Sequence, residues 1–178
     1  MKIRWNALFN SLLLLGFLFI VTGLQTVFWY ELFGNVPAPL LWLNVVVYLA
    51  LYRKPFPAII SIYVVGFTLL SFTAMPLKMM WITLLLLFAL VNGIKSRVFW
   101  AGSGYYSIMC AFSVVAYHVI YILTSLLIEK NSVSLEITER IVQIILTPTF
   151  AFIMYWVLAK IDKMTQDQLM HEVGGVEL

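Results

Sequence analysis

The sequence predicts an all-α integral membrane protein with six transmembrane helices, and three observations support this prediction. The chain of 178 residues is 63% hydrophobic and only 11% charged, with a mean hydropathy of +0.99. Its apolar residues gather in six long runs, and its Lys and Arg residues fall in the gaps between them. A soluble domain carries about 45–50% apolar and about 25% charged residues. This composition therefore favours a chain that lies in a bilayer.

The six apolar runs define the elements that we expect. The spans are predicted at about Ala7–Phe28, Ala38–Tyr52, Ala58–Thr73, Met79–Ile94, Ser103–Ile128 and Ile141–Ile161. A helix needs about 20 apolar residues, at about 1.5 Å each, to cross the hydrocarbon core. The second and fourth runs are shorter, so we expect them to tilt less, to extend into the interface or to thin the bilayer locally. Residues 1–163 form one domain, followed by a polar tail, residues 164–178.

The basic residues predict the orientation. Eight lie on one side of the predicted membrane, namely Lys2, Arg4, Arg53, Lys54, Lys95, Arg97, Lys160 and Lys163, and three lie on the other, namely Lys78, Lys130 and Arg140. The richer side faces the cytoplasm in multi-pass proteins, so both termini are predicted inside. The same rule explains the basic pI of 9.0 without a nucleic-acid partner. The first run is longer than the apolar core of a signal peptide and lacks a small-residue cleavage site, which indicates an uncleaved span.

Prolines and aromatic residues add local expectations. Pro37 and Pro39 are predicted to open the second span, where a missing N–H is harmless. Pro55 and Pro57 follow Arg53-Lys54, so this turn is predicted to be short and stiff, and Pro148 is expected to kink the sixth span. Loops are predicted at 29–37, 74–78 and 129–139. Amphipathic rings near span ends indicate an interfacial belt, made of Trp5, Trp29, Tyr30, Tyr52, Trp81, Phe99, Trp100, Tyr105 and Tyr106.

The runs carry little that resembles catalytic chemistry. No acidic or basic residue lies in the middle of a run, where proton relays and ion pathways place them. Cys110 and His118 are the lone cysteine and the lone histidine within the runs, so they cannot build a zinc site by themselves. We therefore expect no enzymatic activity, no metal and no cofactor. Cys110 is interpreted as a packing residue, and His118 as a neutral side chain bonded to a neighbouring helix, with a pocket-lining or pH-sensitive role as the alternative.

Six polar side chains are spread over the runs: Asn10, Gln25, Asn44, Asn92, His118 and Gln143. Polar groups that face lipid lack partners, so we expect these to turn inward and link helices. The alternative is a central cavity lined by Gln25, Asn44, Asn92 and His118. Small residues indicate close helix contacts, within the chain or with a partner. They are Gly16 and Gly23 on the first run, and Gly104, Ser107 and Ala111 on the fifth.

The order of these features resembles the MreD family of bacterial rod shape-determining membrane proteins. The segment from Pro37 to Arg53 reads PAPLLWLNVVVYLALYR, and Pro55 follows it. Further along come Gly66 in an apolar run, the Pro76–Leu77 turn, the stretch Lys95-Ser-Arg-Val-Phe-Trp100, Thr147–Pro148, and a sixth run that ends Leu158-Ala-Lys-Ile-Asp162. The resemblance spans nearly the whole chain and rests on pattern. Leu70 and Lys78 depart from it, where the family often has an acidic residue and a glycine.

The resemblance implies a non-enzymatic scaffold of the cell-wall elongation (rod) complex in the bacterial cytoplasmic membrane. Such a protein binds the transmembrane helix of MreC and so connects indirectly to the actin-like MreB and to the peptidoglycan synthesis enzymes that maintain rod shape. The resemblance is also compatible with a homodimer of this protein within the complex. The implied fold is similar to the substrate-binding component of energy-coupling-factor transporters. A vitamin-binding component of that kind is the alternative function, with Gln25, Asn44, Asn92 and His118 as its lining.

Overall fold

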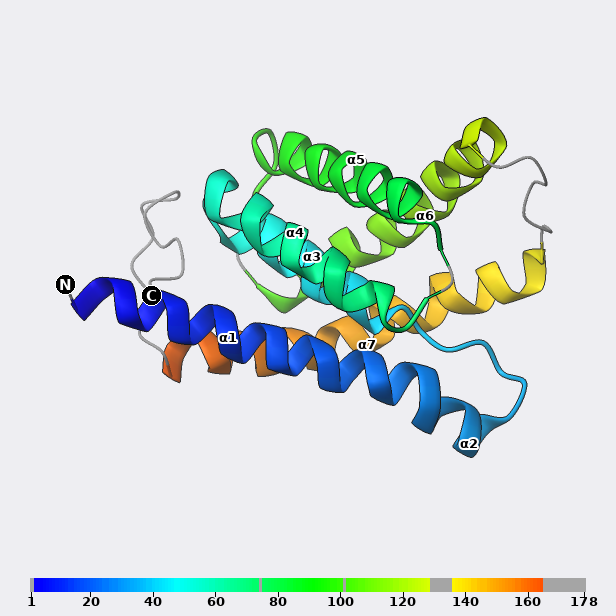
Figure 1. The fold of residues 1–178 in the computed structure, drawn as a ribbon, viewed down its shortest axis with the longest axis horizontal. Coiled ribbons are helices and arrows are strands. Elements are labelled where there is room, and N and C mark those ends of the chain that lie inside the picture. Colours follow the sequence, from blue (N-terminus) through cyan, green and yellow to red (C-terminus); the bar gives the residue numbers. More distant parts are fainter. Residues whose placement is uncertain (1, 74, 101, 129–135, 165–178) are drawn as a thin grey trace.

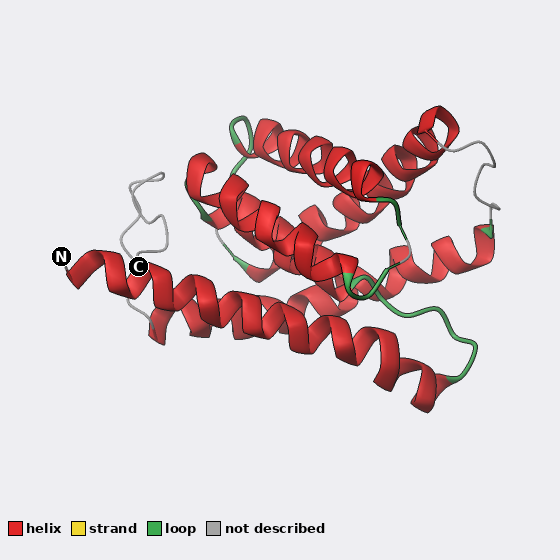
Figure 2. Cartoon of the chain, viewed as in Figure 1, coloured by secondary structure: helices red, strands yellow, loops and turns green. Residues whose placement is uncertain are grey.

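The computed structural model describes residues 2–73, 75–100, 102–128 and 136–164, and within them all regular structure is helical (Figures 1 and 2). The elements are α1 (Lys2–Gly23), the π-helical η1 (Leu24–Phe28), α2 (Trp29–Phe33), α3 (Leu41–Tyr52), α4 (Pro55–Leu70), α5 (Leu77–Lys95), α6 (Ser103–Ile128) and α7 (Ile137–Met164). Each predicted apolar run forms a helix. The predicted polar tail lies, after Met164, outside the described residues.

Four stretches are long and apolar enough to cross a membrane: Phe9–Phe33, Leu77–Lys95, Ser103–Ile128 and Ile137–Met164. The predicted class, an all-helical protein whose helices suit a membrane, is confirmed at this level. The other two apolar helices, α3 and α4, are shorter. At about 1.5 Å per residue, the 12 residues of α3 extend only about 18 Å.

The short helix α3 forms the centre of the bundle. Every residue of α3 except Leu41 is buried. It packs against α1, α4, α5, α6 and α7, so protein rather than lipid surrounds its apolar run. Such a helix has no exposed surface that must match the thickness of a bilayer, and this explains how a run shorter than the usual span fits the fold.

The chain enters α3 through an extended stretch, which corrects the prediction that Pro37 and Pro39 open this helix. The backbone N–H of Leu40 donates to the Thr147 hydroxyl of α7 at 2.9 Å. The N–H of Leu41 donates to the side-chain oxygen of Gln25 at 3.0 Å. Non-helical backbone at membrane depth requires such partners, because no water is present to replace them. Side chains of two other helices therefore fix the start of α3.

The first span continues further than predicted. Residues 29–33 were expected in a loop, but they form α2, which follows α1 through the wider π-helical turn of η1. The indole N–H of Trp29, the first residue of α2, donates to the carbonyl of Val36 beyond the helix at 2.9 Å. The loop is therefore confined to the residues between Phe33 and Leu41. At the other end of α3 the short turn is as predicted, because α4 begins at Pro55 itself.

Successive long helices run in alternating directions. The beginning of α1 lies beside the end of α7 (Figure 1). There, the Lys95 ammonium at the end of α5 donates to the carbonyls of Ala50 and Arg53 at the end of α3, at 3.3 and 3.2 Å. We call this end of the bundle the Arg53 end. The opposite end, where α3 and α7 begin, is the Arg140 end.

Two members of the predicted aromatic belt are core residues instead. Tyr52 and Tyr106 are buried and form a cluster of rings with Tyr48 of α3 and Tyr155 of α7, at centroid distances of 4.8 to 6.4 Å. The Tyr106 hydroxyl donates to the backbone carbonyl of Asn44 at 2.6 Å. A phenol whose hydroxyl finds such a partner can be buried without loss, so proximity to a span end did not fix its location.

The glycines differ in what surrounds them. A Cβ added to Gly66 of α4 would lie 2.7 Å from the indole of Trp81, so α4 and α5 approach closely at this point. A Cβ added to Gly16 or Gly23 would meet nothing within 4 Å. These two residues of α1 therefore form no close helix contact within the described chain. Their predicted contact with a helix of a partner protein stays a prediction.

Candidate functional site

A buried polar cluster joins three helices at the Arg53 end. Asp162 of α7 is 1% exposed, and its carboxylate accepts hydrogen bonds from the Asn10 amide of α1 at 2.9 Å and from the Tyr48 hydroxyl of α3 at 2.8 Å. It also forms a salt bridge with Arg53, whose side chain is 14% exposed. The Arg53 guanidinium donates in addition to the Asn10 side-chain oxygen.

This cluster is suited to holding helices together. Breaking a buried ion pair by removing one partner costs about 3–5 kcal/mol, because the other charge is left uncompensated. Asp162 is hydrogen-bonded from α1 and α3 at the same time, so α1, α3 and α7 are tied at one point. The sequence pattern indicates Arg53 only as a cytoplasmic charge and a motif position. It gives no sign of the ion pair with Asp162, which stands one residue beyond the predicted sixth span.

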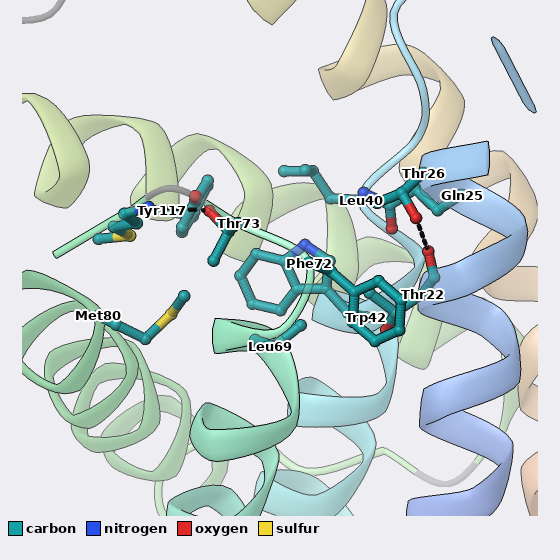
Figure 3. Close-up of a pocket in the computed structure, with 11 residues that line it drawn as sticks. Thr22, Gln25, Thr26, Leu40, Trp42, Leu69, Phe72, Thr73, Met80 and Tyr117 are labelled. Atoms are coloured by element: carbon teal, nitrogen blue, oxygen red, sulfur yellow. Dashed lines mark hydrogen bonds between the residues drawn. The ribbon is translucent and has the colours of Figure 1, made fainter. Parts of the chain in front are cut away.

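At the Arg140 end, a cavity of about 180 Å³ lies between α1, α3, α4, α5 and α6. Figure 3 shows Thr22, Gln25 and Thr26 on one side and Met80 on the other, with the rings of Trp42 and Phe72 between them. Leu40 and Tyr117 also line it. The cavity therefore combines aromatic walls with a polar edge from the first span.

A second cavity, of about 460 Å³, opens beside the first. Leu40 and Tyr117 belong to both linings, so the two cavities adjoin at these side chains. The second lining is more polar and also includes His118, Tyr121, Glu136, Glu139, Arg140 and Gln143. Ligand sites in proteins typically occupy about 300–1,000 Å³, and the adjoining cavities reach that size together.

Arg140 and His118 organise the second cavity. A guanidinium nitrogen of Arg140 lies 3.2 Å from Nδ1 of His118, and the guanidinium carbon lies 5.7 Å from the centre of the Tyr121 ring. An arginine side chain can only donate, so Nδ1 must be the acceptor and the ring is neutral with its proton on Nε2. That Nε2 is buried without a hydrogen-bond partner in the described chain. The contact joins α6 to α7, as expected for His118.

The four residues expected to line one cavity do not meet. Gln25 lines the first cavity and His118 the second. Asn44 lies in the core, where its amide donates to the carbonyl of Thr147 at 3.3 Å. Asn92 lies near the end of α5, at the Arg53 end. Two of the four therefore share one end of the bundle, and the other two serve elsewhere.

The positions quoted for the family resemblance are structural in this fold. Pro76 precedes α5 as Pro55 begins α4, and Pro148 lies inside α7. Beside it, the Ser107 hydroxyl of α6 donates to the Pro148 carbonyl at 2.7 Å. Pro37 lies in the extended entry to α3, Arg53 belongs to the buried cluster, and Gly66 forms the close contact of α4 with α5.

A third concavity lies on the flank of the bundle between α1 and α4, with a volume of about 170 Å³. We call it the α1/α4 groove. Val45 and Leu49 of α3 form its buried floor, and Ser11, Leu14 and Leu15 of α1 form one wall. Ile60, Ser61, Val64 and Val65 of α4 form the other wall.

Among the described residues, no group of three or more His, Cys, Asp and Glu side chains is arranged to hold a metal ion. Comparisons of the chain with protein-family models, with curated proteins and with solved structures give no match.

Proposed function

We propose that this chain is a non-enzymatic membrane scaffold of the MreD kind, with six helices crossing the bacterial cytoplasmic membrane and both termini inside. The alternating helix directions support this orientation. Within the described chain, the Arg53 end carries Arg53, Lys54, Lys95, Arg97, Lys160 and Lys163, whereas Lys78 and Arg140 lie toward the opposite end. By the positive-inside rule, the Arg53 end faces the cytoplasm.

The observation on which the scaffold proposal rests is the α1/α4 groove. Its rim is open to the surroundings, since Ile60 is 52% and Val64 37% exposed, while its floor is buried. Its lining is apolar except for the small side chains of Ser11 and Ser61. Helices in membranes associate where small residues let them approach and where side chains interdigitate. A groove with an apolar floor and small wall residues suits a single apolar helix.

The partner that the family resemblance implies is the transmembrane helix of MreC. The buried cluster supports this role indirectly, because the Asn10–Asp162 bond and the Arg53–Asp162 pair fix α1 relative to α3 and α7. A rigid α1 keeps one groove wall fixed over the floor that α3 provides. Binding then requires no large rearrangement of the scaffold.

Disulfide cross-linking tests the groove directly. Ser61→Cys is combined with a series of single cysteines along the transmembrane helix of MreC, and Ile59→Cys serves as the control on the same helix. The natural Cys110 is buried, so its background should be low. We expect a cross-link from Ser61→Cys with a helical periodicity along the partner, and little from Ile59→Cys. Equal cross-linking from both positions would contradict a helix seated in the groove.

Depletion tests the cellular role. Loss of the protein is expected to round rod-shaped cells, because the elongation complex would no longer assemble. Cells that lack a second copy of the gene and keep their rod shape on depletion would contradict the proposal.

A further inference from the structure

We propose that the two adjoining cavities at the Arg140 end form one binding site for a small molecule that carries a flat apolar ring and a single carboxylate. The proposal goes beyond the scaffold role and does not depend on it, since the α1/α4 groove and the cavities share no lining residue.

The first cavity fits the ring. Trp42, Phe72 and Tyr117 contribute aromatic surfaces, and Met80 contributes a flexible apolar side chain that adapts to different outlines (Figure 3). The Trp42 and Tyr117 rings already pack edge to face, with their centroids 5.3 Å apart. A ligand ring would enter a site whose walls are held in place, which lowers the ordering cost of binding.

The second cavity fits the carboxylate. Among the described residues of its lining Arg140 is the one cation, and none of the described carboxylates lies within 4.0 Å of its guanidinium. The guanidinium is instead oriented by His118 and by the Tyr121 ring. A planar guanidinium held in this way is suited to bidentate recognition of a carboxylate. Glu136 and Glu139 are exposed at the same cavity, and their charges favour a monoanion over a dianion.

His118 holds the guanidinium at the cavity wall. The side chain is 7% exposed and lines the second cavity, and its Nδ1 accepts the hydrogen bond from Arg140. Its Nε2 is buried, so the ring acts through Arg140 and does not meet the ligand directly. The oriented Arg140, which has no carboxylate partner in the described chain, is the reason for assigning an anionic ligand rather than a neutral one.

Indole-3-acetate is the probe that tests this site, with indole and acetate as probes for the ring alone and the charge alone. Binding is measured by isothermal titration calorimetry on the purified full chain in detergent. Arg140→Gln removes the guanidinium, and Lys78→Gln is the control, because Lys78 is an exposed cation at the same end that lines neither cavity. Retention of the wild-type elution volume in size exclusion verifies that each variant is folded.

We expect saturable binding of indole-3-acetate that is weakened about tenfold or more by Arg140→Gln, since a charge-assisted hydrogen bond is lost, and unchanged by Lys78→Gln. Indole and acetate should each bind more weakly than the joined molecule. The absence of saturable binding to the wild type, or equal binding by Arg140→Gln, would overturn the proposal. So would Arg140-dependent retention of phosphatidylglycerol that indole-3-acetate does not displace, because that result would assign the site to a lipid headgroup. None of these outcomes bears on partner binding through the groove.

Discussion

Arg53 and Asp162 are 109 residues apart in the sequence, and their side chains form a buried ion pair where the ends of α3 and α7 meet. Asn10 of α1 bonds to both partners. One carboxylate thus ties α1 and α3, which belong to the first third of the chain, to α7, the last helix of the described residues.

Removing Arg53 should lower the free energy of unfolding more than removing the charge of Asp162. Arg53→Gln leaves the carboxylate of Asp162 buried without its counter-charge, so we expect a loss of about 3–5 kcal/mol in the free energy of unfolding. Asp162→Asn leaves a charge that is partly exposed and should be less harmful. Thermal unfolding followed by size exclusion in detergent measures both, with Lys160→Gln, an exposed cation of α7, as the control. An Arg53→Gln protein as stable as the control would contradict the clamp.

The close contact of α4 with α5 predicts that Gly66 does not tolerate a larger side chain. The Trp81 ring cannot move away easily, because it stacks on Tyr63 at a centroid distance of 4.0 Å and packs against Phe67 at 5.4 Å. Gly66→Ala should therefore destabilise the fold by about 1–3 kcal/mol, as overpacking does.

The matched control for Gly66 is Gly93→Ala, since a Cβ at that helical position meets nothing within 4 Å. The difference in apparent melting temperature between the two variants measures the effect. Equal melting temperatures would show that Trp81 relaxes at no cost.

Thr147 is predicted to matter for the entry to α3. Thr147→Val removes the acceptor of the Leu40 N–H, and a buried donor left unsatisfied costs about 1–3 kcal/mol. Thr149→Val is the matched change two residues away, where the exposed hydroxyl bonds only to Ile145 of its own helix. We expect hydrogen exchange at the Leu40 amide to rise in the first variant and not in the second. Equal exchange in both would rule out this bond as the anchor.

The orientation yields a prediction that does not depend on stability. Reporter fusions at Met1 and at Leu178 should both give cytoplasmic signals, because α1 begins and α7 ends at the Arg53 end of the bundle. A periplasmic signal from either fusion would mean that the helices do not all cross the membrane.

The helices could be predicted because six apolar runs separated by polar gaps leave a chain in a bilayer little choice of backbone structure. The central location of α3 could not be predicted from the shortness of its run. Composition does not distinguish a helix covered by protein from one covered by lipid. Its irregular entry depends on acceptors from Gln25 and Thr147, and no local pattern indicates them.

The site residues were predicted less well for the same reason. Gln25, Asn44 and His118 each contact another element of the fold, in keeping with the need of polar groups in a membrane for partners. Which partner each finds depends on packing between distant segments. Asp162 was missed because it follows the sixth run among lysines, where a solvated carboxylate is the ordinary expectation. The only hint in the sequence was its place in the ending Leu158-Ala-Lys-Ile-Asp162.

The most direct test of the scaffold proposal is affinity purification of the tagged protein in mild detergent, followed by mass spectrometry of the proteins that accompany it. The wild type is compared with Ser61→Trp, which fills the α1/α4 groove, and with Ile59→Trp, which adds the same ring outside it. We predict that MreC accompanies the wild type and Ile59→Trp but is lost from Ser61→Trp. Recovery of a transporter ATPase pair in place of MreC would contradict the scaffold function, and recovery of MreC with all three proteins would contradict the groove.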